Sequence, residues 1–320
     1  MPVANAYLGT SEFAATVLRI LAASPHRPAL VVTPPDRPAG RGRKLSAPPV
    51  ATAAGELGLP LHQTRSVNEP GSVATLREAG AEVGCVCAFG QLIGEPLLSE
   101  VPMLNVHPSL LPRWRGAAPI ERAIMAGDAE TGVAVMRLTE GLDSGPVAIE
   151  EREPIGPADT YGSLAPRLAE TGGRMLVRAL DLLEAGELRF EEQPAEGVTY
   201  ADKIGAADRR LDPARTALEL ERMVRALSPH VGAFFALGPG ERLGVRSAAA
   251  IAEADLTEDE PAPDPEPGST AAAGRRLLVR CGEGILAVDG VQPAGKRAMD
   301  ASEWLRGHEP PARVGGTGAG

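Results

Sequence analysis

The sequence predicts an α/β protein, in which a mostly parallel sheet carries helices on both faces and a smaller β-rich module follows it. In the first half, short apolar runs of strand length alternate with amphipathic stretches of helix length, as in βαβ units. In the second half, one clear helix precedes several short strand-like runs. A chain of 320 residues is also too long for one ordinary core, so two domains are expected.

The first half supplies the elements of the parallel sheet. Strands are expected at residues 6–9, 29–33, 83–89, 103–106 and 133–138. Helices are expected at residues 12–23, 49–58, 73–79, 119–126 and 161–184. Asn5 interrupts the first apolar run, and Ser11 is placed to cap the helix that follows. Ligands of such sheets bind beyond the carboxyl ends of the strands, so a functional site is expected there.

The second half predicts a separate module. After a first domain over residues 1–187, the polar and weakly periodic segment 188–206 predicts a linker. The second domain is expected over 207–305, with a helix at 213–227 and strands at 233–237, 242–246, 276–281 and 285–291. The acidic, proline-rich segment 253–270 predicts a disordered surface loop, and the Gly- and Pro-rich residues 306–320 predict a mobile tail.

Composition excludes several classes of protein. Hydrophobic residues at 43% and charged residues at 23% are typical of a soluble globular protein, and no apolar run is long enough to span a membrane. The start of the chain lacks a basic and leucine-rich signal segment, so a cytoplasmic location is expected. Cys85 and Cys87 are expected to be small buried apolar residues, and no metal site is expected, because no further Cys or His with ligand spacing lies nearby.

The net charge of −10 is unevenly distributed. Residues 253–267 hold seven acids and no base, which leaves −3 for the rest of the chain. Residues 33–49 carry Arg37, Arg41, Arg43 and Lys44 against Asp36 alone. Because salt screens fields over about 8–10 Å, local charge matters more than the total, and an RNA partner remains compatible with this acidic chain.

The run NVHPSLLPRWRGAAP at 105–119 and the phrase GLDSGP at 141–146 carry the chemistry. Asn105 and His107 are two residues apart at a strand end, so their side chains lie on one face, and a turn can bring Asp143 to them. Acyl transfer between nitrogens develops an oxyanion that Asn105 and His107 can stabilise as N–H donors. Asp143 either orients His107 and favours its charged form, or handles the amine proton directly or through water.

These motifs resemble the 10-formyltetrahydrofolate-dependent formyltransferase family. Further agreement is found at Gly127-Asp-Ala-Glu-Thr-Gly, Thr199-Tyr-Ala-Asp-Lys and Val291-Gln-Pro-Ala-Gly-Lys. The loop Pro35-Asp-Arg-Pro-Ala-Gly-Arg-Gly-Arg-Lys is diagnostic of the branch of the family that acts on tRNA. The resemblance covers nearly the whole chain, and it implies a Rossmann-like domain followed by a small OB-like β-barrel.

The resemblance also implies an activity and its sites. The activity is transfer of the formyl group of 10-formyltetrahydrofolate to the α-amine of methionine on initiator tRNA, for translation initiation. Asn105, His107 and Asp143 are the implied catalytic residues. The expected folate contacts are Phe89, Gly90, Gln91, Ser109, Leu110, Leu111 and Pro112. The expected tRNA contacts are Arg37, Arg41, Arg43, Lys44 and, more weakly, Lys203. We expect a monomer that uses no metal and no membrane.

Three alternatives differ from this interpretation. A formyltransferase acting on a small amine, such as a sugar nucleotide or glycinamide ribonucleotide, would keep the three catalytic residues without needing the basic loop or this second domain. A non-catalytic RNA-binding protein would not need the three residues. A nicotinamide oxidoreductase is disfavoured because no G-x-G-x-x-G follows the first strand.

Overall fold

The computed structural model describes residues 1–39, 44–95, 97–258 and 260–315. The chain divides into two compact units, and each unit is made of three separate segments of the sequence. The first unit comprises residues 1–119, 130–154 and 165–202. The second comprises residues 120–129, 155–164 and the chain from 203 onward.

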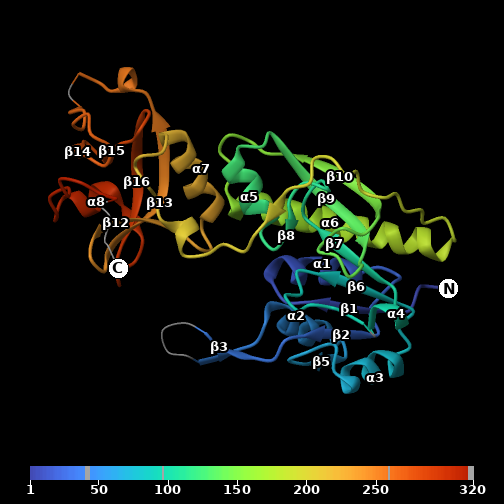
Figure 1. The fold of residues 1–320 in the computed structure, drawn as a ribbon. Helices are drawn as coiled ribbons and strands as arrows, with labels where there is room; N and C mark the ends of the chain where they lie inside the picture. The colour runs from blue at the N-terminus through green and yellow to red at the C-terminus, as the bar shows by residue number, and fades with distance from the viewer. Residues whose placement is uncertain (40–43, 96, 259, 316–320) are drawn as a thin grey trace. The chain divides into compact units, whose positions relative to one another are not determined.

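The first unit is built on one mixed sheet with the strand order β10-β9-β7-β6-β1-β2-β5 (Figure 1). The strands are β1 (Asn5–Gly9), β2 (Leu30–Thr33), β5 (Leu61–Gln63), β6 (Val83–Cys87), β7 (Met103–His107), β9 (Glu130–Arg137) and β10 (Val147–Pro154). From β5 to β7 all neighbours are parallel, whereas β9 pairs antiparallel with β7 and with β10. The predicted mostly parallel sheet is confirmed, and β5 and β10 were not predicted.

Helices cover both faces of this sheet, and β1 shows how its residues divide between them. Tyr7 faces α1 (Glu12–Ala22), where its hydroxyl donates to the Ala14 carbonyl at 2.6 Å. On the opposite face, Ala6 and Leu8 pack with residues of α3 (Pro70–Glu78) and α4 (Leu97–Glu100). Helix α2 (Pro49–Leu57) packs beside α1. This alternation is the period of two that a strand imposes.

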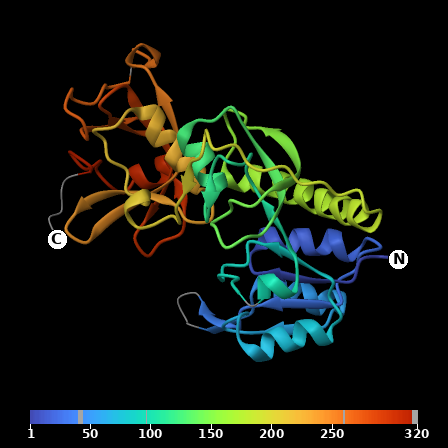
Figure 2. The ribbon, with the colours of Figure 1, turned by 45° about the vertical axis from the view of Figure 1, so that its right-hand side comes forward.

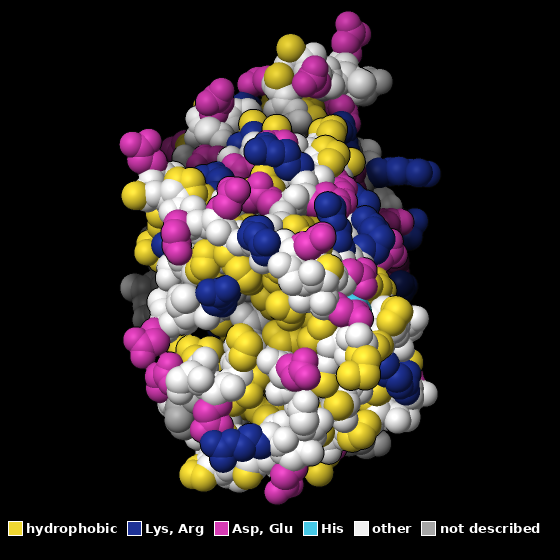
Figure 3. Space-filling view, turned by 90° about the vertical axis from the view of Figure 1, so that its right-hand side faces the viewer, with side chains coloured by type: hydrophobic (Ala, Val, Ile, Leu, Met, Phe, Trp, Pro, Cys, Tyr) yellow, Lys and Arg dark blue, Asp and Glu magenta, His cyan; other side chains and the backbone are white. Residues whose placement is uncertain are grey.

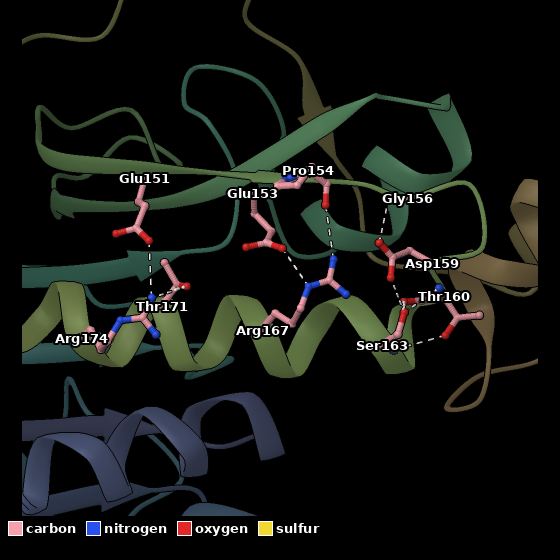
Figure 4. Close-up of polar contacts among 10 residues, drawn as sticks. All are labelled: Glu151, Glu153, Pro154, Gly156, Asp159, Thr160, Ser163, Arg167, Thr171 and Arg174. Atoms are coloured by element: carbon pink, nitrogen blue, oxygen red, sulfur yellow. Dashed lines mark hydrogen bonds and ion pairs between the residues drawn. The ribbon is translucent and has the colours of Figure 1, made fainter.

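The long helix α6 (Tyr161–Glu184) lies close to β7 and α1 because of two glycines. A Cβ at Gly172 would lie 2.7 Å from Val106 Cγ1, and a Cβ at Gly173 would lie 2.6 Å from Ile20 Cδ1. Toward β10, Arg167 pairs with Glu153 at 2.8 Å and Arg174 with Glu151 at 3.5 Å (Figure 4). The helix start is capped by mutual bonds between Thr160 and Ser163.

The second unit contains a curled antiparallel sheet, a half-barrel, with the order β12-β13-β16-β15-β14. Its strands are β12 (Ala233–Gly238), β13 (Glu241–Ile251), β14 (Thr270–Ala273), β15 (Arg276–Arg280), β16 (Ile285–Pro293) and β17 (Met299–Asp300), which pairs with β16. Its helices include α5 (Pro119–Ala126), α7 (Ala217–Leu227) and α8 (Ala301–Leu305). One core joins Leu220 and Leu227 of α7 to Phe235 of β12 and Trp304 of α8. The predicted β-rich module is confirmed.

Several boundaries differ from the sequence prediction for identifiable reasons. Asn5 does not interrupt β1, because it is buried and its amide donates to the Val3 and His26 carbonyls. Helix α7 begins at Ala217 rather than at 213, because Thr216 and Glu219 form a capping box there. Ser11 caps α1, as predicted, by accepting from the Ala14 N–H.

The acidic segment and the tail also make defined contacts. Glu253 pairs with Arg280 at 2.8 Å, and Glu260 pairs with Arg276 at 2.7 Å. In the tail, Val314 is buried in the second unit's core and its N–H donates to the Gly268 carbonyl at 2.8 Å. These contacts hold described residues of a segment for which the sequence predicted a disordered loop and of a segment for which it predicted a mobile tail.

A short hairpin that was not predicted projects from the first unit (Figure 2). It consists of β3 (Arg37–Ala39) and β4 (Lys44–Ser46), with Arg37 opposite Ser46. Within the described part of the chain, no helix is long and apolar enough to cross a membrane. On the face shown in Figure 3, Lys and Arg side chains lie among Asp and Glu side chains, so no extended field of one sign covers that face.

Candidate active site

A cavity of about 440 Å³ lies beyond the carboxyl ends of β6 and β7 in the first unit. It is lined by residues from four segments: 86–93, 105–108, 116–119 and 138–143. Ligands of parallel sheets bind at the carboxyl ends of the strands, so this cavity lies where a site was predicted. The cavity volume falls within the range typical of small-molecule sites, which is about 300–1,000 Å³.

Asn105, His107 and Asp143 meet at this cavity. Strand β7 carries Asn105 and His107 on the same face, and both are almost fully buried. Asn105 Nδ2 lies 3.4 Å from Asp143 Oδ1, and His107 Nδ1 lies 3.7 Å from Asp143 Oδ2. The structure therefore brings Asp143 to Asn105 and His107, which precede it by 38 and 36 positions in the sequence.

The hydrogen bond of the His107 ring fixes which nitrogen faces the acid. Its Nε2 lies 2.9 Å from the carbonyl oxygen of Trp114. A carbonyl only accepts, so Nε2 carries a hydrogen in both the neutral and the charged ring. Nδ1, the nitrogen that faces Asp143, then carries a hydrogen only in the imidazolium. Any donation by His107 to a reacting oxygen has to come from Nδ1, because Nε2 is engaged by Trp114.

The backbone around this trio is unfavourable for residues that have a Cβ. Among the described residues, the non-glycine residues with positive φ are Ala88 at 41°, Trp114 at 62° and Asp143 at 43°. Ala88 and Asp143 line the cavity, and Trp114 accepts the bond from His107. Such conformations persist only where the surroundings impose them, and they concentrate at functional sites.

Asp143 is held by a backbone donor that the sequence did not reveal. The Gly116 N–H donates to Asp143 Oδ2 at 2.8 Å. Gly116 lies in β8 (Arg115–Gly116), which pairs with β11 (Tyr200–Ala201), and a Cβ at this position would lie 2.9 Å from the Ala201 carbonyl oxygen. A glycine is required there, because its φ of 120° is also outside the range of other residues.

The predicted folate residues divide into two groups. Phe89, Gly90 and Gln91 line the cavity. The Gln91 side chain is turned away to hold this wall, since its oxygen accepts from the Val67 N–H and its nitrogen donates to the Thr64 carbonyl, both at 2.9 Å. The wall thus offers the cavity its backbone groups and apolar side chains.

The second group, Ser109, Leu110, Leu111 and Pro112, does not line the cavity. The Ser109 hydroxyl donates to the Arg113 carbonyl at 2.7 Å, and Leu111 packs with Ala134 and Met136 in a small core cluster. These contacts shape the loop that leads to Trp114. The structure therefore connects this group to His107 through the backbone and not to the cavity surface.

The predicted tRNA residues are only partly described. Arg37 is exposed on β3, and Lys44 lies on β4. Arg41 and Arg43 lie outside the described residues. Lys203 is exposed, and it is the first residue of the part of the second unit that begins at 203.

The two cysteines beside the site are inert packing residues, as predicted. Cys85 and Cys87 are fully buried on β6, and burial raises the pKa of each thiol to about 12. A thiolate is the reactive form, so neither side chain is a nucleophile near neutral pH. In the described part of the chain, no group of three or more His, Cys, Asp or Glu side chains is arranged to hold a metal ion.

Fold and site together define the class of protein: a Rossmann-like α/β unit with a polar trio at its strand ends, joined to a unit with a curled antiparallel sheet. A family model described as formyl transferase matches residues 1–180, and one described as formyl transferase, C-terminal domain, matches residues 203–309. The chain belongs to the formyl transferase family.

Relatives across nearly the full length agree. The methionyl-tRNA formyltransferase of Symbiobacterium thermophilum is 46% identical over 305 residues, which cover 94% of this chain and 91% of that protein. The methionyl-tRNA formyltransferase of Methylobacterium sp. (strain 4-46) is 45% identical over 318 residues, which cover 96% and 98%.

Solved structures share the fold at low identity. HypX from Aquifex aeolicus in complex with tetrahydrofolic acid superposes with a TM-score of 0.62 at 15% identity, over 95% of this chain and 47% of that one. The chain thus spans about half the length of HypX. WlaRD, a sugar 3N-formyl transferase, gives a TM-score of 0.61 at 13% identity, over 93% and 100% of the two chains.

Proposed function

We propose that this protein transfers the formyl group of 10-formyltetrahydrofolate to the α-amine of methionine on initiator tRNA. The observation that carries the proposal is the convergence of Asn105, His107 and Asp143 on one cavity. This site lies in a chain that is 46% identical, over nearly its whole length, to a protein named methionyl-tRNA formyltransferase. The amide, imidazole and carboxylate are the groups that formyl transfer between nitrogens needs.

In the proposed reaction the amine nitrogen attacks the formyl carbon, and a tetrahedral intermediate with an oxyanion results. Asn105 Nδ2 and, in the charged ring, His107 Nδ1 are the N–H donors at the cavity that stabilise this oxyanion. The new bond joins the amine nitrogen to the formyl carbon, the amine loses a proton, and the bond from that carbon to the folate nitrogen breaks. The folate nitrogen leaves with a proton.

Asp143 has two roles compatible with its contacts. Its Oδ2 is engaged by Gly116 and faces His107 Nδ1, so this oxygen orients the imidazole. Its Oδ1 accepts from the Asn105 amide at 3.4 Å, and we assign this oxygen to receive the amine proton, directly or through water.

We propose that the folate binds against the wall formed by residues 88–93. A pterin is flat and carries hydrogen-bonding groups on its edge, so it suits a cavity with apolar side chains and a few backbone polar groups. Val86, Ile93 and Leu138 supply apolar surface, and the backbone around Gly90, where φ is 73°, supplies polar groups. Residues 109–112 act in this proposal through the loop that they shape.

We propose that Arg37, Arg41, Arg43 and Lys44 contact the tRNA, with Lys203 as a further phosphate contact. Basic side chains that are close together in the sequence suit the phosphate backbone and adjacent base edges of an RNA. In this proposal residues 1–187 form the catalytic domain, 188–206 connect it to the tRNA-binding domain 207–305, and 306–320 form the tail.

Formyl incorporation tests the proposal directly. Purified protein is incubated with labelled 10-formyltetrahydrofolate and methionyl initiator tRNA, and labelled product is expected on the tRNA. Turnover of a sugar nucleotide or glycinamide ribonucleotide by the same preparation, without tRNA product, would overturn the assignment of the acceptor. Arg41→Ala is expected to reduce tRNA formylation while leaving hydrolysis of the folate donor unchanged.

A further inference from the structure

One segment contacts both the loop that carries Asp143 and the loop whose Trp114 carbonyl binds His107. We call residues 190–201 the strap, residues 112–118 the tryptophan loop and residues 139–146 the aspartate loop. All three belong to the first unit. The sequence predicted only a polar linker for the strap, but most of its hydrogen bonds to other described residues join it to these two loops.

Gln193 of the strap joins the two loops through its side-chain amide. Its Nε2 donates to the carbonyl oxygens of Asp143 at 2.8 Å and Gly145 at 2.7 Å. Its Oε1 accepts from Arg115 Nε at 3.0 Å and Nη2 at 2.7 Å. The two groups bonded to Nε2 can only accept and the two bonded to Oε1 can only donate, so the side-chain amide has a single possible orientation.

Thr199 acts on His107 indirectly, through Trp114. Its hydroxyl oxygen accepts from the Trp114 N–H at 2.8 Å, and its carbonyl accepts from the Arg115 N–H at 2.9 Å. The carbonyl of the same Trp114 accepts from His107 Nε2. The Thr199 hydroxyl therefore fixes the peptide that fixes the imidazole.

Both ends of the strap are anchored independently of these bonds. At one end, the Arg137 guanidinium lies 4.1 Å from the centre of the Phe190 ring, and Glu191 exchanges two backbone hydrogen bonds with Val147. At the other end, Tyr200 and Ala201 pair with β8. Anchored ends let the strap hold Gln193 and Thr199 at fixed places between the loops.

We propose that Gln193 and Thr199 are positioning residues, which set the geometry of Asp143 and His107 without touching the reacting atoms. Asp143 and Trp114 both have positive φ, so their loops need external bonds to stay in this conformation. A displacement of about 1 Å in a catalytic group can lower a rate by about 10². This inference rests on the proposed function, because it needs the trio to be catalytic.

Gln193→Glu is the sharpest test, since it changes one NH₂ group to oxygen at constant shape. The carboxylate keeps Arg115 as a partner but faces the Asp143 and Gly145 carbonyls with an acceptor. We expect kcat to fall about 10–100-fold, with the KM for the folate donor within about 3-fold of wild type. Glu192→Gln, a change of the same chemical kind at the exposed neighbouring residue, is expected to leave kcat unchanged.

Thr199 offers a paired test with a built-in rescue. Thr199→Val removes the oxygen that accepts from Trp114 and is expected to lower kcat several-fold, whereas Thr199→Ser keeps that oxygen and is expected to restore it. Wild-type kcat in both Gln193→Glu and Thr199→Val overturns the inference. So does a loss of activity that matches only the fraction of unfolded protein, measured by circular dichroism on the same samples.

A readout that is independent of activity separates this inference from the proposed function. If the wild-type protein makes no formylated product, the proposed function fails, but ring ¹⁵N chemical shifts still report on His107. We expect its Nε2 signal to shift in Gln193→Glu and Thr199→Val and to stay at the wild-type position in Glu192→Gln. Unchanged shifts in all three variants overturn the positioning role.

Discussion

The strap and the acidic segment, residues 253–270, look alike in sequence and differ in what holds them. Both are polar, contain several Glu residues and lack a clear period. The acidic segment is tied by side-chain ion pairs such as Arg280–Glu253, and the Glu253 and Glu266 side chains are 62% and 70% exposed. The strap is tied by half-buried Gln193 and Thr199, whose partners are backbone groups and a guanidinium.

This difference teaches that the partner and its burial, not the composition of a segment, decide what the segment does. An exposed ion pair contributes about 0.2–1 kcal/mol, because water and salt screen it. Removing one partner of a buried hydrogen bond leaves the other unsatisfied and costs about 1–3 kcal/mol. Of two polar segments with similar sequences, one can therefore contribute little to stability while the other fixes the geometry of catalytic residues.

The largest expected effect concerns the carboxylate of Asp143, the residue whose backbone carbonyl Gln193 of the strap holds. Asp143→Asn keeps an oxygen for the Gly116 N–H but removes the charge beside His107 and the proton acceptor. We expect kcat for formyl transfer to fall on the order of 10²–10³. Steady-state kinetics at saturating tRNA measure this, and a kcat within about 3-fold of wild type would remove Asp143 from the mechanism.

A smaller effect tests the pairing of the strap with the tryptophan loop. In Gly116→Ala the new methyl group meets the Ala201 carbonyl and a positive φ, so the free energy of unfolding is expected to fall by about 1–3 kcal/mol. Chemical denaturation measures this. Gly71→Ala on α3 is the matched control, because a Cβ there has no neighbour within 4 Å and φ is not positive. Equal destabilisation by both changes would contradict the close approach.

The half-buried capping box of α7 is expected to give an effect between the largest and the smallest, and this effect depends on pH. Bonds from Thr216 and Arg215 lower the pKa of Glu219 to about 2. A depressed pKa stabilises the folded state above the unfolded value near 4.5, and this contribution is lost as pH falls toward 2. Thr216→Ala is expected to reduce the free energy of unfolding by about 1 kcal/mol at pH 7. The difference from wild type should shrink between pH 4.5 and 2, and a constant difference would refute the linkage.

The smallest effect is expected in the acidic segment. Glu253→Gln and Glu266→Gln, which remove exposed ion pairs with Arg280 and Arg313, should each change the free energy of unfolding by less than about 0.5 kcal/mol. Denaturation in low and high salt measures both variants. A loss as large as that from breaking a strap bond would erase the distinction between the two segments.

The sequence predicted those features that depend on local pattern. Alternating apolar runs located the parallel strands except β5, and the two-residue spacing of Asn105 and His107 indicated their shared face. Cys85 and Cys87 were recognisable as buried because nothing near them could bind a metal. These inferences needed only the period of a strand and the chemistry of single side chains.

The rest depended on distant partners. Nothing near Gly116 in the sequence shows that its N–H donates to Asp143, and Gln193 carries no local signal, because its partners lie about 50 and 78 positions away. Asn5 was misjudged for the same reason, since its partner His26 lies 21 positions away. Ser109 and Leu111 were predicted to contact folate because they belong to a family motif, but their contacts are with Arg113 and with a core cluster and not with the cavity.

The discontinuous division of the chain has a consequence for recombination between related genes. The chain passes from one unit to the other at 119/120, 129/130, 154/155, 164/165 and 202/203. In a chimera joined at 202/203, Arg122 and Met125 come from one parent. Asp208, which pairs with Arg122, and the core against which Met125 packs come from the other parent. Parents that differ at these contacts will give hybrids with a mismatched second unit. The C-terminal half can be exchanged as a cassette only together with residues 120–129 and 155–164.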